Sequence, residues 1–361
     1  MIKSFDEVFE DVTKLGVKIK TDEYHPIGKY QIIDQGQEAV AGYSDLEDGV
    51  FENVPAIVFG DHTRIVKYVD QPFFLGADGL KVLRSRFKDA NYRYLYYALK
   101  SVKIPNTGYN RHFKWLKEAK IYYPNSEEQS KIVLILDGIS SVIEHRQRQL
   151  QKLDELVKAR FVELFGDPIS NPKGWKKDKA ESHIDLLSGY PFQSEQYVND
   201  GINICGGLII MPQKIQWQDC RHWPSVDGYE DYLLDEDDIV MALDRPWISE
   251  GFKIAQVDST HLPALLIQRT ARIRGIDVNQ QYLFHCFVNG GFDKHSNVTG
   301  SLVPHISAKD IRSFEILLPP IKLQKQFAAF VKQVDKSKVA VQKALDEAQL
   351  LFDSLMQKYF G

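Results

Sequence analysis

The feature that most constrains this chain is a long segment that occurs twice. Residues 121–166 align without a gap to residues 316–361, at an offset of 195 residues. Pro124 and Pro319 match near the start of the two copies, and a Phe-Gly pair closes each copy. Self-similarity at a fixed period predicts a tandem arrangement of similar units instead of one continuous domain.

Both copies carry apolar side chains in alternating steps of four and three. The pattern runs from Ile132 to Leu164 in the first copy and, 195 residues later, from Phe327 to Tyr359 in the second. Such heptad spacing is typical of a helix that packs along its whole length, and these runs exceed the ~10–14 residues of an average helix. We call each apolar row a seam and expect the two seams to pair as a coiled coil. The alternative is that each helix packs on its own domain.

Positively charged residues interrupt both seams. Arg146 and Arg160 lie on the first seam, and Lys338 lies on the second. They would either fix the register of the pair or face a partner protein. If the domains joined by the helices lie at opposite ends, the pairing must be antiparallel.

The segments that precede the two helices also match, although more loosely. Residues 91–97 parallel residues 279–285, and Thr107-Gly108 parallels Thr299-Gly300. The chain is therefore expected to alternate between domains and helices. The expected domains are residues 1–120 and 167–315, and the expected helices are residues 121–166 and 316–361.

Each domain is expected to be mixed α/β, which gives the chain an α+β fold class. Strand-like runs bounded by Gly, Asp and Asn occur at residues 30–33, 56–59, 65–69, 239–242 and 253–257. The tyrosine-rich stretch 92–100 has helical spacing. We expect its aromatic side chains to pack on the strands, with base stacking as the alternative.

Composition and charge exclude several classes of protein. Hydrophobic residues make up 43% of the chain, which argues against disorder, and the formal net charge of −4 argues against a protein that coats nucleic acid by itself. Three widely separated cysteines predict neither structural zinc nor disulfides, so a reduced, cytoplasmic location is expected. The first residues lack the apolar run of a signal peptide, and no run approaches the ~20 apolar residues that span a membrane.

The motifs of common catalytic sites are absent from the sequence. It has no GxxxxGK[ST] phosphate loop, no GxSxG nucleophile turn and no Asn/Asp-Pro-Pro-aromatic motif of an amino-methyltransferase. The histidines lack HxH and HxxxH spacing, so no metal site is predicted. Glu118 and Lys120 form one Glu-x-Lys motif without an evident acidic partner. We interpret them as a solvated charge pair, although a nuclease also needs such groups.

The whole chain resembles the specificity subunits of type I restriction–modification enzymes. The resemblance rests on the repeated helical segment, from residue 123 to the Phe-Gly-Asp-Pro run at 165–168, and on the run LPPIKLQKQF at 318–327. Further short sequence motifs that resemble the family occur in the first domain at 25–27, 33–36 and 58–63, and in the second at 189–192 and 237–242. In that family two target recognition domains alternate with two helical regions, and each domain reads one half of a split DNA site.

The resemblance implies that this chain binds double-stranded DNA and catalyses no reaction itself. Modification subunits would bring S-adenosylmethionine, and restriction subunits would use ATP and Mg²⁺, so no cofactor or metal is expected in this chain. Helices of ~36 residues would be roughly 54 Å long and would set the spacing of the half-sites. The expected docking surface for the methyltransferase comprises Glu144, Arg146, Arg148 and Lys158.

Side chains that read bases must reach base edges from loops, because lysine and arginine on phosphates only position the protein. The loop 107–112 is the most favoured unit, since Gly108 gives it freedom and Asn and Arg match adenine and guanine. The candidates in the first domain are Gln35, Gln37, Tyr43, His62, Thr63, Arg64, Tyr109, Asn110, Arg111 and His112. The candidates in the second domain are Tyr190, Gln193, Ser194, Arg245, Trp247, Ser301 and His305.

Three alternatives to a type I specificity subunit stay open at this point. The nearest is the recognition subunit of a type IIB system, in which the partner combines methylation and cleavage. A free-standing DNA-binding protein or nuclease would use Glu118 and Lys120. A coiled-coil scaffold without a DNA role would lack the steep salt dependence that phosphate contacts impose on binding.

Overall fold

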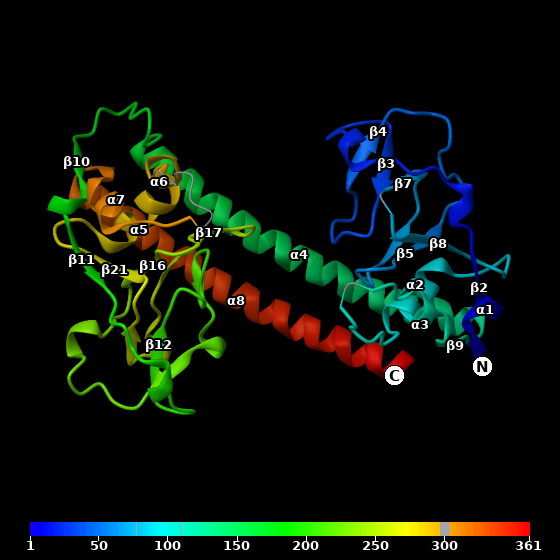
Figure 1. Ribbon diagram of the computed structural model, residues 1–361. Coiled ribbons are helices and arrows are strands. Elements are labelled where there is room, and N and C mark those ends of the chain that lie inside the picture. Colours follow the sequence, from blue (N-terminus) through cyan, green and yellow to red (C-terminus); the bar gives the residue numbers. More distant parts are fainter. Residues whose placement is uncertain (77, 109, 297–303) are drawn as a thin grey trace. The chain divides into compact units, whose positions relative to one another are not determined.

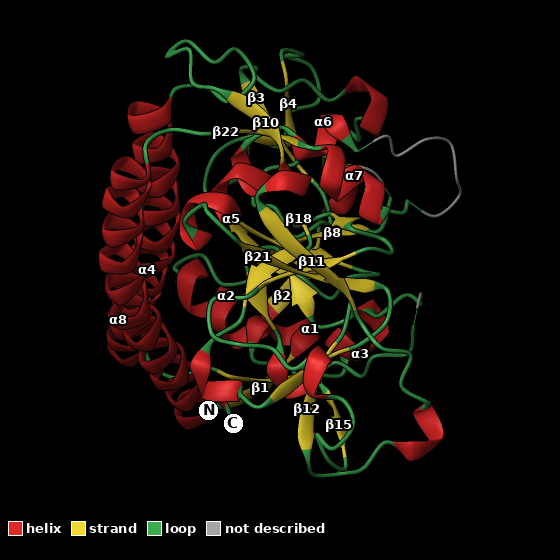
Figure 2. Cartoon of the chain, turned by 90° about the vertical axis from the view of Figure 1, so that its left-hand side faces the viewer, coloured by secondary structure: helices red, strands yellow, loops and turns green. Residues whose placement is uncertain are grey.

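The computed structural model describes residues 1–76, 78–108, 110–296 and 304–361, and it divides into two compact units (Figure 1). The first unit comprises residues 1–148 and 342–361, and the second comprises residues 149–341. Strands, short helices and two long helices make up the chain (Figure 2), as the expected mixture of helix and strand requires.

The first unit contains two small sheets and a two-stranded ladder. A four-stranded antiparallel sheet has the order β2 (Phe9–Asp11), β8 (Leu80–Ser85), β5 (Ala56–Gly60), β6 (Val66–Val69). A three-stranded sheet has the order β4 (Gly42–Ser44), β3 (Tyr30–Ile33), β7 (Phe73–Leu75), and β3 runs parallel to β7. The ladder joins β1 (Ile2–Ser4) to β9 (Lys120–Tyr122), and the short helices are α1 (Phe5–Val8), α2 (Tyr92–Lys100) and α3 (Phe113–Lys117).

The second unit repeats this arrangement. Its four-stranded antiparallel sheet has the order β11 (Ile184–Ser188), β21 (Thr270–Gly275), β16 (Ile239–Ala242), β19 (Ile254–Gln256). Its three-stranded sheet has the order β15 (Arg221–Trp223), β12 (Ile202–Cys205), β20 (Ala264–Leu266), with β12 parallel to β20. A ladder joins β10 (Lys177–Lys179) to β22 (Glu315–Leu317).

Among the residues that the structure describes, the second unit also has two hairpins and three short α-helices. The hairpins pair β13 (Ile210–Met211) with β14 (Lys214–Ile215) and β17 (Trp247–Ile248) with β18 (Gly251–Phe252). The helices are α5 (Gln280–Asn289), α6 (Phe292–His295) and α7 (Ala308–Ser313). The strands expected from the sequence are present as β3, β5, β6, β16 and β19, and the stretch 92–100 is a helix.

Matching hydrogen bonds show why the loosely similar segments fold alike. Asn91 caps α2 by accepting from the Tyr94 N–H, and Asn279 caps α5 by accepting from the Tyr282 N–H. The Tyr94 hydroxyl then donates to the Tyr122 carbonyl at 2.6 Å. The Tyr282 hydroxyl donates to the Leu317 carbonyl at 2.8 Å. Both tyrosines are completely buried, which confirms that they belong to the core.

The two long helices predicted from the heptad pattern are present. They are α4 (Ser126–Phe165) and α8 (Ile321–Phe360), each of 40 residues. A side-chain amide stabilises each entry: Gln129 Nε2 donates to the Pro124 carbonyl at 2.9 Å, and Gln324 Nε2 donates to the Pro319 carbonyl at 2.8 Å. The boundaries of the four segments expected from the sequence stay a prediction.

The seams are buried in both units. In the first unit, Ile132 and Leu136 of α4 belong to the same core cluster as Phe352 of α8, and the red end of α8 lies beside α2 in Figure 1. In the second unit, Phe161 of α4 packs against Phe327 of α8, with ring centroids 5.5 Å apart. Removing a buried aromatic ring of this kind costs about 3–5 kcal/mol.

The charged seam residues of the second unit have partners. The Lys338 ammonium lies 2.5 Å from Asp154 of α4 and 3.6 Å from Asp335 of its own helix. The guanidinium of Arg160 lies 5.7 Å from the centre of the Phe330 ring. Lys338 thus makes the kind of contact between helices that can fix a register.

Two general expectations can be compared with the described residues. Cys205, Cys220 and Cys286 are free, and no group of three or more His, Cys, Asp or Glu within residues 1–76, 78–108, 110–296 and 304–361 could hold a metal ion. Among the helices of the same residues, none is long and apolar enough to cross a membrane.

Candidate nucleic-acid interface

In the first unit, one side chain holds together the loops that leave β3, β5 and β7. Gln35 follows β3, and its Nε2 donates to the Asp78 carbonyl at 3.0 Å. Its Oε1 accepts from the His62 N–H at 3.2 Å, and its carbonyl accepts from the Thr63 hydroxyl at 2.6 Å. Three residues predicted as DNA readers, Gln35, His62 and Thr63, are therefore brought together.

The loop that includes residues 110–112 joins the same cluster. The Nδ1 of His62 lies 3.2 Å from the Asn110 carbonyl. The hydrogen bond and charge of Lys18 hold the pKa of Asp78 below its usual value, and the charge of Arg111 adds a smaller effect. We call the residues Gln35, His62, Thr63, Asp78, Asn110 and Arg111 the first loop cluster. It combines an amide, an imidazole and a guanidinium, which are groups able to bond to base edges.

A buried aspartate that the sequence analysis missed anchors this loop. Asp61 is only 4% exposed, and its carboxylate accepts from the Phe113 N–H at 2.7 Å. Its carbonyl accepts from the His112 N–H at 2.8 Å. An Asp immediately after a buried strand is a weak signal by itself, because many turns begin in this way.

His112, which was predicted to read a base, lies inside the first unit. His112 is completely buried, its Nδ1 lies 3.0 Å from the Asp61 carbonyl, and its ring packs on Trp115. These contacts hold the loop against β5, and base reading by His112 stays a prediction.

The other candidates of the first unit differ in exposure. Gln37, Thr63, Asn110 and Arg111 are exposed, although the Asn110 amide also donates to the Thr107 carbonyl at 2.5 Å. Tyr43 is half-buried, and its backbone pairs with His25. Arg64 is half-buried, has a left-handed φ of 65°, and donates weakly to the Ile104 carbonyl at 3.4 Å. Tyr109 lies outside the described residues.

The second unit has a cluster at the equivalent loops. The Leu243 N–H, after β16, donates to the Arg269 carbonyl at 3.0 Å, and the Arg245 N–H donates to the Pro304 carbonyl at 3.0 Å. Asp244 lies between two side chains, 3.1 Å from Arg269 Nη1 and 2.7 Å from His305 Nδ1. We call Asp244, Arg245, Arg269 and His305 the second loop cluster. Arg245, Arg269 and His305 are exposed, and Arg269 was not among the predicted readers.

The remaining candidates of the second unit are less closely joined to this cluster. Tyr190 packs on Phe192, with ring centroids 5.0 Å apart, and its carbonyl accepts from the Gln268 N–H at 2.8 Å. Trp247 is half-buried and stacks on Phe252 at 5.2 Å.

Gln193 and Ser194 are exposed at the start of a short turn. Ser301 lies outside the described residues.

The residues predicted to dock a partner lie on α4. Glu144, Arg148 and Lys158 are exposed, and Arg146 is half-buried. Arg148 lies 4.0 Å from Glu144, one helical turn away. At such exposure the pair contributes only about 0–1 kcal/mol to stability, so both charges can be recruited by another protein.

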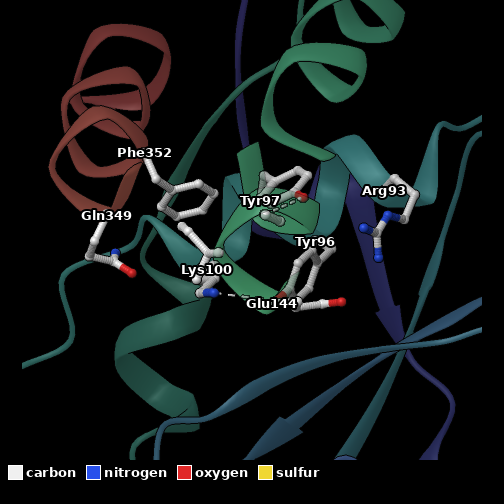
Figure 3. A pocket seen from close by; sticks show the side chains of 9 residues that line it. Arg93, Tyr96, Tyr97, Lys100, Glu144, Gln349 and Phe352 are labelled. Carbon is white, nitrogen blue, oxygen red and sulfur yellow. Dashed lines mark hydrogen bonds between the residues drawn. The ribbon is translucent and has the colours of Figure 1, made fainter. Parts of the chain in front are cut away.

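A shallow pocket of about 230 Å³ lies in the first unit, where α2 meets α4 and α8 (Figure 3). Arg93 bonds to Asp137 at 2.5 Å, and the Tyr97 hydroxyl donates to the same carboxylate at 2.6 Å. Burial, followed by the bond to Asp137, raises the pKa of Tyr97. Lys100 lies 5.5 Å from the centre of the Phe352 ring. These contacts fasten α2 to the long helices. The pocket is lined by Arg93, Tyr96, Tyr97, Lys100, Ser140, Ile143, Glu144, Gln349 and Phe352.

Comparison with known families gives one match over most of the chain. Residues 1–155 and 225–348 match the family model described as "Type I restriction modification DNA specificity domain". Both loop clusters fall largely within these ranges.

Curated relatives give the same family. The type I restriction enzyme EcoAI specificity subunit of Escherichia coli is 29% identical over 225 residues, which cover 59% of this chain and 36% of that protein. The type I restriction enzyme MjaVIII specificity subunit of Methanocaldococcus jannaschii is 26% identical over 292 residues, which cover 73% of this chain and 69% of that protein. The match to the first of these relatives thus spans only about a third of its length.

Solved structures show the same fold. The S subunit of a type I restriction–modification system from M. genitalium superposes with a TM-score of 0.61 at 16% identity, covering 100% of this chain and 96% of that one. A chain from a structure titled for complex assembly and conformational transition of the type I system gives a TM-score of 0.51 at 15% identity, covering 100% and 97%.

Proposed function

Because the chain belongs to the type I restriction–modification DNA specificity family, we propose that it is the subunit that selects the DNA sequence on which such an enzyme acts. The observation that carries this proposal is the repetition of one loop cluster in two units of the same topology. The first cluster combines amides, an imidazole and one guanidinium group, and the second combines two guanidinium groups and an imidazole. Two similar frames that carry different polar groups suit the reading of two different half-sites.

Each unit reads one half of a bipartite DNA site in this proposal. The exposed members of the first loop cluster, with Gln37, Tyr43 and Arg64, face the first half-site. The second loop cluster, with Tyr190, Gln193, Ser194, Trp247 and Ser301, faces the other. His112 is left out of this set, because it is buried and we propose that it anchors the loop. Phosphate contacts from neighbouring cationic groups fix the position of each unit on the duplex.

The two long helices pair as an antiparallel coiled coil that separates the two reading units. This pairing is supported by shared cores: residues near the start of α4, such as Ile132, cluster with Phe352 near the end of α8. Conversely, Phe161 near the end of α4 clusters with Phe327 near the start of α8. A helix of 40 residues is roughly 60 Å long. The protein makes no contact with the edges of the bases between the half-sites. The two reading domains are residues 1–120 and 167–315.

Methyltransferase subunits dock on the exposed sides of the paired helices, where Glu144, Arg146, Arg148 and Lys158 are the expected contacts. The chain itself performs no chemistry in this proposal. The modification subunits supply S-adenosylmethionine for methylation, and the restriction subunits supply ATP- and Mg²⁺-dependent cleavage. The negative net charge of −4 fits a protein whose partners contribute much of the phosphate neutralisation.

Co-expression with the partner methyltransferase, followed by mapping of methylated adenines, tests the function. The expected result is one bipartite motif with a fixed number of unspecified bases between its halves. A methylated genome without such a motif, or methylation that does not depend on this chain, contradicts the proposal. A variant with Glu144 and Arg148 both replaced by Ala tests the docking surface. It should no longer co-purify with the methyltransferase, and it should keep its fold, because both residues are exposed.

A further inference from the structure

The two units carry different residues at one equivalent position, directly before β8 and β21. In the first unit this residue is Gly79, whose carbonyl accepts from the Asp61 N–H at 2.6 Å. In the second unit it is Arg269, whose carbonyl accepts from the Leu243 N–H at 3.0 Å. The strand registers agree, because β5 ends opposite the first residue of β8 and β16 ends opposite the first residue of β21.

This position favours glycine in both units, yet the second unit has an arginine there. The φ angle is 92° at Gly79 and 62° at Arg269, and both values lie in the left-handed region. A residue with a side chain rarely adopts that region, because its Cβ comes too close to the following carbonyl oxygen. Arg245, the neighbour of Asp244, has a left-handed φ of 45° as well. Such backbone conformations cluster at functional sites, where another requirement outweighs their cost.

The space that an arginine needs is present only in the second unit. A Cβ added at Gly79 would lie 2.7 Å from the His62 ring and 2.9 Å from the Gln35 amide. The residue that corresponds to Gln35 in the second unit is Gly207, since β3 and β12 each end two residues earlier beside their parallel partners. The first unit therefore combines Gln35 with a glycine, and the second unit combines a glycine with Arg269.

The guanidinium of Arg269 is both held and accessible. Its Nη1 lies 3.1 Å from the Asp244 carboxylate, while its side chain is 74% exposed. The other oxygen of Asp244 lies 2.7 Å from His305, so the carboxylate is itself fixed from two sides. A guanidinium has five N–H donors, and one bond to a carboxylate leaves an edge for a second, bidentate acceptor.

Building on the function proposed above, we propose that Arg269 reads a guanine in the half-site bound by the second unit, and that Asp244 holds its guanidinium in place. Guanine offers two acceptors, O6 and N7, in the major groove, and arginine is the side chain that most often bonds to both. At the same position the first unit offers the Gln35 amide and the His62 ring, so its half-site is read by different groups.

The test uses the complex of the full chain with its methyltransferase subunit. Affinities are measured on duplexes in which each base pair of the mapped motif is replaced in turn. Arg269→Gly is the main variant, because glycine suits the left-handed backbone and preserves the fold. The expected result is a roughly 5- to 150-fold loss of discrimination at a single G·C pair of one half-site, with the other half-site unchanged. Arg312→Ala, at an exposed arginine of α7 in the same unit, should change nothing.

Arg269→Lys separates a base contact from a phosphate contact. Lysine keeps the charge and loses the planar pair of donors, so this variant should also lose discrimination at the same base pair. Two results overturn the assignment: unchanged discrimination in Arg269→Gly, or a uniform loss of affinity for all sequences with a weaker salt dependence. If the unmodified chain directs no bipartite methylation, the proposed function fails, and this outcome is distinct from a failure of the Arg269 assignment.

Discussion

Replacing Gln35 by Ala should weaken recognition of one half-site and leave the other unaffected. Gln35 makes two side-chain hydrogen bonds, to the Asp78 carbonyl at 3.0 Å and from the His62 N–H at 3.2 Å. Each such bond contributes about 0.5–1.5 kcal/mol net. Gln35 is half-buried, so water can form some of these hydrogen bonds in the variant. We therefore expect the binding free energy for the first half-site to fall by about 1–2 kcal/mol. The loops that carry His62 and Thr63 then become less ordered.

That loss corresponds to about 5- to 30-fold weaker affinity, since 1.4 kcal/mol is a factor of ten. The assay is competition binding of the methyltransferase complex on duplexes altered in either half-site. Discrimination should fall in the half-site of the first unit alone. Glu38→Gln is the matched control, because Glu38 is exposed on the same loop and is not among the predicted readers. Equal losses in both half-sites, or full discrimination in Gln35→Ala, would refute the role of Gln35 in ordering these loops.

Two further predictions concern the helices and the core of the second unit. Burial, aided by the charge of Lys338, lowers the pKa of His285 to about 3. The stability that follows from keeping His285 neutral is therefore complete above pH ~6.5 and is lost as the pH falls toward 3, by about 3 kcal/mol at pH 4.5. Amide hydrogen exchange in α5 should show this loss, and His285→Leu should flatten the pH dependence; an unchanged slope would contradict the argument. Lys338→Met removes the ion pairs with Asp154 and Asp335 and should cost about 0.5–1 kcal/mol, because both carboxylates are half exposed. Burial already raises the pKa of Asp335, with Lys338 acting against it. A carboxyl group whose pKa is raised in the folded state lowers the stability as the pH rises through that pKa. Thermal unfolding of Lys338→Met should therefore show a larger loss of stability at pH 7 than at pH 4. Lys336→Met, at an exposed position, should show neither effect.

The long helices and the tandem order were predictable because their signals are periodic and local. The seam from Ile132 to Leu164 and its copy 195 residues later predict two long amphipathic helices from local sequence alone, without knowledge of the tertiary contacts. The strands at 56–59 and 239–242 were also predictable, since they are continuous apolar runs, and every residue from Ala56 to Gly60 is buried. The family resemblance followed from the same repeated segment.

The candidate interface was less predictable because it depends on contacts between distant loops. His112 has the composition of a base reader, but its backbone and ring bond to Asp61, 51 residues away. Arg269 gave no sequence signal, because its equivalence to Gly79 emerges only from the strand registers. Whether a polar loop residue holds a neighbour or faces solvent is decided by tertiary packing, which periodicity does not encode.

In the proposed function the long helices set the distance between two reading units, and a paired insertion tests this most directly. Seven residues, inserted after Arg148 in α4 and after Val341 in α8, fall where the two units divide and preserve the heptad frame. Each insertion lengthens its helix by roughly 10 Å, or about three base pairs. Mapped methylation should then show both half-sites unchanged, with about three more unspecified bases between them. The same spacer as in the unmodified chain, or a changed half-site sequence, would contradict the account.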